Sequence, residues 1–293
     1  MSPGPELAEA AYAKINLTLR IVGRRLDGYH ALESLVCFAR VGDQLTLRPG
    51  AALGLDVHGP RAEAAGPRDQ NLVLKAARAL AERVRGLTLG HFTLLKRLPA
   101  GAGLGGGSAD AAAALRLLAR ANGLSLADPR LMAAALASGA DVPVCVDSTP
   151  RWMRGLGEIL SAPLQLPELE AVLVFPGTPL ATKDVFAGFR AGEASQAPVS
   201  TVPESNGEIA RSTLLEWLAG EGNDLERPAI ARLPLIGDVL AALRAQHGCE
   251  LARMSGSGSA CFAIFPSQRS ADAAARALAV RERWWVEATC LGG

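Results

Sequence analysis

Aromatic residues are scarce in this chain of 293 residues, which contains four Trp, two Tyr and seven Phe. Proteins that bind single-stranded nucleic acid stack bases on several aromatic side chains of one face. The scarcity of aromatic residues therefore argues against single-strand binding by this chain. A basic excess is also missing, because 30 Lys and Arg stand against 29 Asp and Glu, for a formal net charge of +1. Broad binding to a nucleic-acid backbone is therefore not expected, and any phosphate recognition must be local.

Signals for metal centres and membranes are missing as well. The five Cys form no CxxC pair and the four His lie far apart, which argues against a zinc site and favours buried thiols in a reducing compartment. No apolar run approaches the roughly 18 residues that span a bilayer, and residues 1–11 lack the apolar segment of a signal peptide. We therefore expect a cytoplasmic protein with no nucleic-acid or membrane partner.

The residues that are present predict a large core. Hydrophobic residues make up 49% of the chain, and its length suits two domains. Helical periodicity and alternating strand patterns are interspersed, which predicts two α+β domains, over 1–160 and 161–293. A polar segment at 191–212 predicts a surface loop in the second domain.

One strand and one helix are predicted around candidate site residues. Residues 11–22 alternate between apolar and polar side chains, which predicts a half-buried strand with Lys14 and Asn16 on its polar face. Residues 71–84 predict a helix with Asn71 as its N-cap.

A glycine-dense loop occupies residues 99–108, where five of ten positions are Gly. Glycine lets backbone amides approach a ligand closely, and Ser108 is predicted to cap a helix over 109–121, so the loop and the helix N-terminus together predict a phosphate site. Gly107 stands where a Walker A motif needs Lys, which excludes a P-loop NTPase. The loop matches the dinucleotide motif GxGxxG by letter, but its place near residue 100 disfavours a nicotinamide enzyme.

The loop and six further segments together resemble the GHMP kinases. The segments keep the order seen in the branch that phosphorylates a cytidine-diphosphate-linked methylerythritol. They are AKINL at 13–17, DGYH at 27–30, GADVP at 139–143, GLGE at 155–158, NDLE at 223–226 and SGSG at 255–258.

The resemblance implies a fold, a reaction and an ATP site. The fold would be the two-domain GHMP kinase fold, with an N-terminal domain like domain 2 of ribosomal protein S5 and a ferredoxin-like C-terminal domain. The reaction would transfer phosphate from ATP, with Mg²⁺, to the 2-hydroxyl of that small-molecule substrate; the metal ligands remain open. The ATP-binding positions would be Pro99, Ala100, Gly101, Ala102, Gly103, Leu104, Gly105, Gly106, Gly107, Ser108 and Ala109, with Asn71 and Lys96 beside the adenine.

The resemblance also implies a catalytic pair, Lys14 and Asp141. An Asp near the acceptor hydroxyl can take its proton, and a Lys can keep that Asp ionised while it offsets phosphate charge. The implied substrate-binding positions are Asn16, Tyr29, His30 and Phe186, whose aromatic rings suit a planar cytosine.

Each of these positions also has a simpler interpretation from the sequence alone. Lys14 and Lys96 would be solvated strand residues, Asp141 a turn residue and Asn71 a helix cap. The alternative functions are another GHMP kinase, of the homoserine or mevalonate type, and a nucleotide-binding module without catalysis. Aromatic residues at the cytidine positions argue against the first, and the Lys and Asp pair argues against the second.

Overall fold

Two compact units make up the computed structural model, which describes residues 5–24, 28–189, 209–281 and 283–292. Unit 1 contains Met1–Lys14, Gly42–Ala100 and Gly105–Ser148, and unit 2 contains Ile15–Val41, Gly101–Leu104 and Thr149–Gly293. Each unit is assembled from several segments of the chain. The predicted division into family domains at residue 160 therefore stays a prediction.

Unit 1 consists of a sheet covered by helices. Its strands are β1 (Leu7–Asn16), the second half of β3 (His30–Pro49), β4 (Gly54–His58) and β5 (Gly90–Leu95). Strand β5 pairs antiparallel with β3 and parallel with β4, while β1 pairs with β3. Short 3₁₀ segments lie at Ala62–Ala65, Arg68–Gln70 and Pro143–Cys145.

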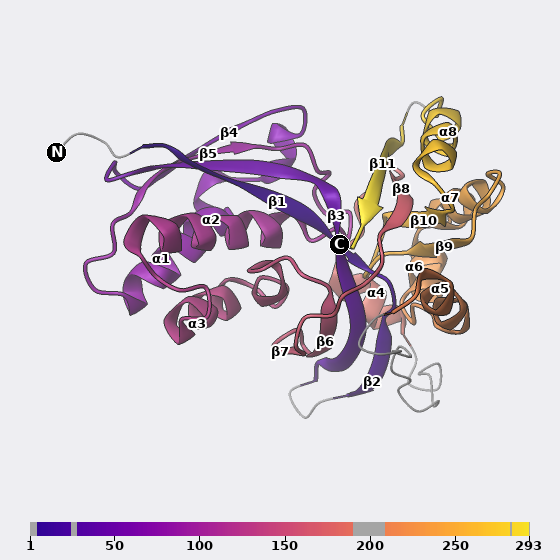
Figure 1. Cartoon of the computed structure of the whole chain (residues 1–293), viewed down its shortest axis with the longest axis horizontal. Helices are drawn as coiled ribbons and strands as arrows, with labels where there is room; N and C mark the ends of the chain where they lie inside the picture. Colours follow the sequence, from indigo (N-terminus) through magenta and orange to yellow (C-terminus); the bar gives the residue numbers. More distant parts are fainter. Residues whose placement is uncertain (1–4, 25–27, 190–208, 282, 293) are drawn as a thin grey trace. The chain divides into compact units, whose positions relative to one another are not determined.

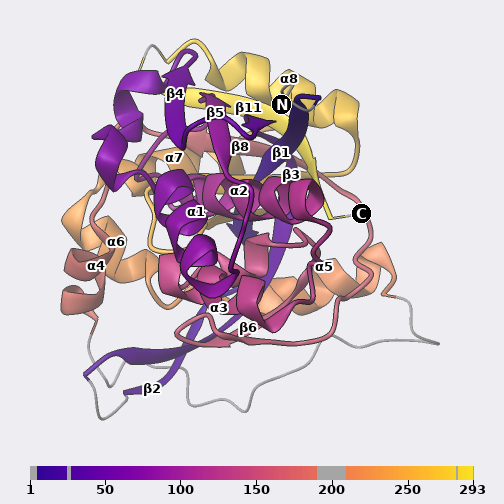
Figure 2. The same ribbon diagram turned by 90° about the vertical axis from the view of Figure 1, so that its left-hand side faces the viewer.

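Three helices cover this sheet, α1 (Leu72–Arg83), α2 (Gly106–Asn122) and α3 (Pro129–Ser138) (Figures 1 and 2). Helix α2 is buried along most of its length because it is rich in alanine, whose small side chain lets neighbouring elements approach closely. The predicted helix over 71–84 is confirmed as α1, with Asn71 as its N-cap.

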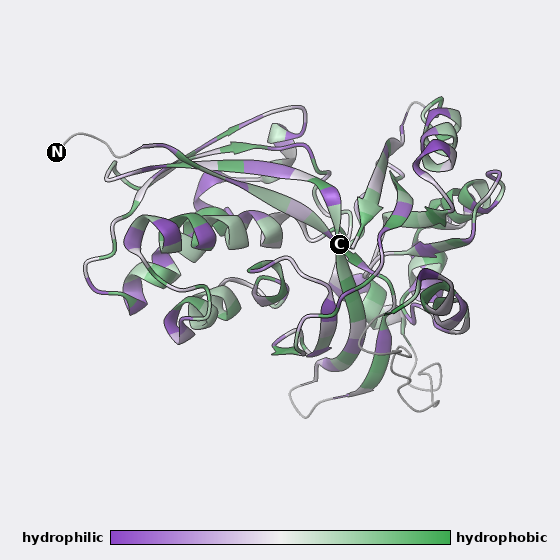
Figure 3. Cartoon of the chain, viewed as in Figure 1, coloured by the Kyte–Doolittle hydropathy of each residue, from purple (hydrophilic) through white to green (hydrophobic). Residues whose placement is uncertain are grey.

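Unit 2 contains an antiparallel sheet in the order β11-β8-β10-β9, with helices α7 and α8 packed on it (Figure 1). The elements are β8 (Leu169–Phe175), β9 (Leu251–Met254), β10 (Cys261–Phe265), β11 (Trp285–Leu291), α4 (Thr182–Gly188), α5 (Arg211–Gly220), α6 (Glu226–Arg232), α7 (Leu235–Arg244) and α8 (Gln268–Leu278). Buried hydrophobic residues of this sheet and these helices, among them Val172, Met254 and Leu240, form a core. Green stretches of ribbon in Figure 3 mark the hydrophobic residues of these elements.

A second group of strands in unit 2 surrounds the first half of β3. It consists of β2 (Arg20–Arg24), β6 (Arg151–Gly155) and β7 (Ile159–Leu160), with β2 and β6 both antiparallel to β3. Residues 151–154, whose role the sequence did not reveal, thus form a sheet strand. Among the described residues, no helix is long and apolar enough to cross a membrane, and the cytoplasmic location stays a prediction.

The prediction of a single half-buried strand over 11–22 is wrong. The chain leaves β1 after Asn16 and enters β2 at Arg20, and the polar face is buried too, since Lys14, Asn16 and Thr18 are at most 4% exposed. Partners explain this burial: Asn16 Nδ2 donates to Ser34 Oγ at 2.7 Å, and Thr18 Oγ1 accepts from the Leu35 amide at 3.0 Å. The alternation was real, but both faces are buried from Ala13 to Leu19, and only the ends of the segment, at Tyr12 and Val22, are exposed.

Two predicted features fall partly outside the described residues. Asp27 of the DGYH segment lies there, as do residues 191–208 of the expected loop.

Candidate functional site

Lys14 and Asp141, the predicted catalytic pair, meet inside unit 1. Lys14 Nζ lies 2.8 Å from Asp141 Oδ2, and the Lys side chain is 4% exposed while the Asp side chain is 36% exposed. The simple reading of Lys14 as a solvated strand residue is therefore wrong. A buried ammonium needs a counter-charge, and this one holds a carboxylate that still reaches the surface and can meet a ligand.

Gly105 brings the glycine loop against Lys14. Its φ is +64°, in the left-handed region, and a Cβ added to it would lie 3.0 Å from Lys14 Cβ. A side chain here would meet both backbone strain and a crowded neighbour. The loop therefore passes directly over the lysine of the pair.

Helix α2 begins at Gly106, so the prediction that Ser108 caps a helix over 109–121 is wrong. Gly105 is the N-cap and supplies no side-chain hydrogen bond, and Ser108 lies in the first helical turn. The left-handed Gly105 lets the chain enter the helix three residues early. The first amides of a helix have no partner within it, and here no cap side chain binds them, which suits an anion at this end.

The loop residues 101–104 belong to unit 2, where they pack against the second glycine stretch. A Cβ on Gly103, whose φ is +80°, would lie 2.7 Å from Gly258 O and 2.8 Å from Ser255 O. The Ala260 amide donates to Ala102 O at 2.8 Å. Glycine is therefore required at 103 by backbone contact within the protein.

Asn71 performs the structural role that its sequence position suggests. Its side-chain oxygen accepts from the Val73 amide at 3.0 Å and so caps helix α1. A contact with adenine stays a prediction.

Lys96 lies in the interior of unit 1, which overturns the simple reading of a solvated charge at a strand end. It is 3% exposed, and its Nζ contacts the carboxylates of Asp43 and Asp110, the latter at 2.7 Å. Burial opposes the charged form of Lys96, but the two carboxylates outweigh burial and raise its pKa. Burial also raises the pKa of Asp110, and the positive charge of Lys96 only partly offsets this rise. Adenine contact by Lys96 stays a prediction.

The predicted substrate residues all lie in unit 2. His30 and Phe186 stack directly on each other, with ring centroids 5.3 Å apart and planes inclined by 20°, while Tyr29 is 65% exposed. A ring inserted between two others needs two van der Waals separations of about 3.5 Å, roughly 7 Å in all. The two rings must therefore separate before a base can lie between them.

Asn16, another predicted substrate residue, has an unsatisfied acceptor atom. Its Oδ1 is buried without a hydrogen-bond partner in the part of the chain that the structure describes. It points at Gly256, since a Cβ there would lie 3.1 Å from this oxygen. An unsatisfied buried acceptor favours a ligand donor at this position.

Asn223 is a structural residue of this region that the sequence did not assign. Its Nδ2 donates to Met254 O at 2.9 Å and to Gly256 O at 2.8 Å, while its Oδ1 accepts from the Leu225 amide at 2.9 Å. The motif NDLE gave its position, and the structure gives its role, which is to fix the second glycine stretch.

Arg253 on β9 had no sequence signal. Its buried guanidinium donates to the carbonyl oxygens of Leu17, Leu218 and Glu221 at 2.7–2.8 Å. Burial lowers its pKa. One side chain thus joins β9 to two other segments of unit 2, at Leu17 and at the end of α5.

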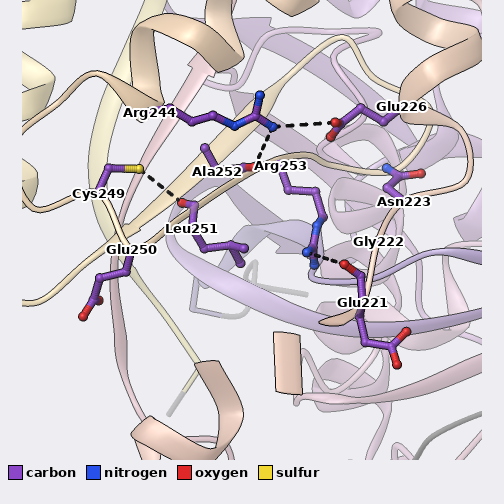
Figure 4. A pocket seen from close by; sticks show the side chains of 10 residues that line it. All are labelled: Glu221, Gly222, Asn223, Glu226, Arg244, Cys249, Glu250, Leu251, Ala252 and Arg253. Atoms are coloured by element: carbon purple, nitrogen blue, oxygen red, sulfur yellow. Dashed lines mark hydrogen bonds and ion pairs between the residues drawn. The ribbon is translucent and has the colours of Figure 1, made fainter. Parts of the chain in front are cut away.

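A pocket of about 440 Å³ opens beside Arg253 in unit 2 (Figure 4). Figure 4 shows Arg244 pointing toward Glu226. Arg244 Nη2 lies 3.9 Å from Glu226 Oε1. The lining residues are Glu221, Gly222, Asn223, Glu226, Arg244, Cys249, Glu250, Leu251, Ala252 and Arg253. None of them is a predicted catalytic, nucleotide or substrate residue, so this pocket is separate from the candidate site.

Metal ligands are sparse. The one group of three potential ligand side chains among the described residues is Glu168, Glu170 and Cys290, on and beside strands β8 and β11. The Cys290 thiol of this group is a soft donor and is unsuited to Mg²⁺, which prefers oxygen ligands.

Two family models match the chain: GHMP kinases N terminal domain, over residues 71–148, and GHMP kinases C terminal, over residues 206–282. The 4-diphosphocytidyl-2-C-methyl-D-erythritol kinase of Methylobacterium radiotolerans is 57% identical over 290 residues, with 97% of this chain and 99% of the relative covered. The protein of that name from Rhodopseudomonas palustris (strain BisB5) is 55% identical over 291 residues, covering 97% and 99%.

Solved structures show the same likeness. A crystal structure of 4-(cytidine 5'-diphospho)-2C-methyl-D-erythritol kinase matches with a TM-score of 0.76 and 35% identity, covering 98% of this chain and all of the other. Homoserine kinase from Cytophaga hutchinsonii matches with a TM-score of 0.68 at 19% identity, covering 99% and 95%, a similarity of fold alone.

Proposed function

Because the chain belongs to the GHMP kinases, and within them to the 4-diphosphocytidyl-2-C-methyl-D-erythritol kinases, we propose that it transfers the γ-phosphoryl group of ATP to the 2-hydroxyl of that substrate. The products are the 2-phosphate and ADP, in the non-mevalonate route to isoprenoid precursors. The observation that carries the mechanism is the 2.8 Å pair of Lys14 and Asp141 beneath Gly105.

Asp141 is the general base in this proposal. Phosphoryl transfer depends on positioning and charge stabilisation more than on covalent chemistry by the protein. The exposed side of the Asp141 carboxylate accepts the proton of the 2-hydroxyl as the hydroxyl oxygen attacks phosphorus. The buried Lys14 ammonium lies 2.8 Å from that carboxylate and stabilises negative charge during transfer.

The glycine loop and the first turn of α2 bind the ATP phosphates. The five glycines within residues 99–109 supply amides that no side chain covers, and the N-terminal end of α2 carries a partial positive charge. Mg²⁺ would be held by the phosphate oxygens and the Ser108 hydroxyl, and it would neutralise phosphate charge.

His30 and Phe186 recognise the cytosine, with Tyr29 and Asn16 as further substrate contacts. The parallel rings of His30 and Phe186 already have the inclination that stacking on a planar base requires. Opening this pair is part of substrate binding, and the contact between the two rings contributes to the cost of opening.

Release of ADP from ATP tests the function. The purified chain is given 4-diphosphocytidyl-2-C-methyl-D-erythritol, homoserine or mevalonate as acceptor. We expect substrate-dependent ADP only with the first. Turnover of homoserine or mevalonate instead would indicate another GHMP kinase, and ADP release with none of them would indicate a nucleotide-binding module.

A further inference from the structure

Three charged side chains meet in the interior of unit 1, directly behind the glycine loop. Lys96 Nζ contacts Asp43 Oδ2 and lies 2.7 Å from Asp110 Oδ2, and all three residues are at most 3% exposed. The second oxygen of Asp110 is buried without a hydrogen-bond partner among the described residues. The catalytic proposal uses none of these contacts.

The three residues come from the two ends of the loop and from a strand beside them. Lys96 follows β5 and precedes the loop, Asp110 follows the loop on α2, and Asp43 lies on β3. Asp43 Oδ1 also accepts from the amides of Arg97 and Leu98, at 2.5 Å and 2.8 Å. The chain is therefore fixed by side-chain contacts just before Pro99 and again just after Ala109.

Lys96 also touches the start of helix α2. A Cβ added to Gly106, the first residue of the helix, would lie 3.3 Å from Lys96 Nζ. The ammonium therefore lies against the first turn, whose amides are proposed to bind phosphate. The carboxylates of Asp43 and Asp110 fix the position of the Lys96 ammonium. If either carboxylate shifts, the ammonium that contacts the first turn of α2 shifts too.

Stability alone does not account for such a group. Removing ions from water is costly, and apolar side chains of similar volume often stabilise a protein as well or better. A buried charged group at the base of a loop instead fixes one geometry, since its hydrogen bonds are directional and leave few alternatives.

We propose that Lys96 and Asp110, supported by Asp43, are positioning residues that close the base of the glycine loop and hold the first turn of α2 in the geometry that binds ATP phosphates. This inference rests on the proposed function of the loop. It assigns Lys96 a role through the loop in place of direct contact with adenine. The two roles differ in a measurable way, because closure of the loop affects every polyphosphate ligand, whereas an adenine contact affects only adenine nucleotides.

Equilibrium binding of ATP and of inorganic tripolyphosphate to the whole chain distinguishes the two roles. Asp110→Ala removes the contact and leaves Lys96 with Asp43 as a neutral pair, and we expect the Kd for both ligands to rise about tenfold or more, as for loss of a charged hydrogen bond. Asp110→Asn keeps a weaker contact and should recover part of this loss. The KM for the cytidine substrate should stay within about twofold, since the perturbation is at the phosphate loop.

Asp128→Asn is the matched control, because Asp128 is an ion-paired N-cap of α3 in the same unit and Asn also caps helices well. It should leave both Kd values unchanged. Unchanged tripolyphosphate affinity in folded Asp110→Ala would overturn the proposal, whether or not ATP affinity falls. If Asp110→Ala does not fold, Asp110→Asn decides in the same way. Failure of the unsubstituted chain to bind ATP would refute the proposed function itself.

Discussion

Gly105→Ala is predicted to damage both stability and catalysis, whereas Gly107→Ala two residues later should not destabilise the fold. At position 105 the backbone has a φ of +64°, and a left-handed conformation costs an alanine about 1–2 kcal/mol. The lower entropy of the unfolded chain returns about 0.4–1 kcal/mol. The new Cβ would also lie 3.0 Å from Lys14 Cβ, so Lys14 must move.

Gly107 is the matched comparison within the same loop. It lies in helix α2, and an added Cβ would make ordinary contact with Leu72 Cδ1 at 3.5 Å. Alanine in a helix is favoured over glycine by about 0.5–1 kcal/mol. The free energies of unfolding of the two variants should therefore differ by about 0.5–2.6 kcal/mol, and the displacement of Lys14 adds to this difference.

Urea unfolding measures this difference, and the turnover of Gly105→Ala reports the displacement of Lys14. We expect Gly105→Ala to have the lower midpoint and a reduced kcat. If Gly105→Ala proved as stable as Gly107→Ala and kept full turnover, the argument from backbone conformation and Lys14 contact would be refuted.

Three further predictions concern other parts of the molecule. Phe186→Leu should raise the KM for the cytidine substrate about fivefold or more without changing the KM for ATP; equal KM values for the cytidine substrate would remove Phe186 from the site. Burial raises the pKa of Asp110 from 3.8 to about 7. As the pH rises from about 4 to about 7, Asp110 therefore loses its proton in the unfolded state before it does so in the folded state, and the free energy of unfolding should fall. Urea midpoints across this range should fall less in Asp110→Asn, and an identical slope in both proteins would contradict the assignment. Asn223→Ala should destabilise the protein by about 2–3 kcal/mol in urea unfolding, because it loses its bonds to Met254 O and Gly256 O; a change under about 0.5 kcal/mol would contradict this role.

Local patterns in the sequence predicted the elements whose cause is local. Asn71 caps α1 as its residue type suggests, and the α+β class follows from periodicity along the chain. The sequence predicts the start of α2 too late, because a serine is a better cap by type than a glycine. The left-handed Gly105 begins the helix earlier. Glycine is favoured at this position because any side chain would crowd against Lys14, and no local sequence pattern indicates that contact.

Burial of polar residues was the main property that the sequence concealed. Lys14, Asn16 and Lys96 read as solvated by type, and each is buried because a partner distant in the sequence satisfies it. The family resemblance identified Lys14 and Asp141 as candidates, and the structure shows that their side chains are in contact. The carbonyl partners of Arg253 had no signal at all, because they are backbone atoms of two separate segments, at Leu17 and at the end of α5.

The rate of ADP release by Asp141→Asn, at saturating ATP and 4-diphosphocytidyl-2-C-methyl-D-erythritol, tests the central claim most directly. Asn keeps the size and surface position of the side chain but removes the base. We predict a kcat lower by about 10²–10⁴ with the protein folded. Turnover equal to that of the unsubstituted chain would show that Asp141 does not take the proton of the acceptor hydroxyl.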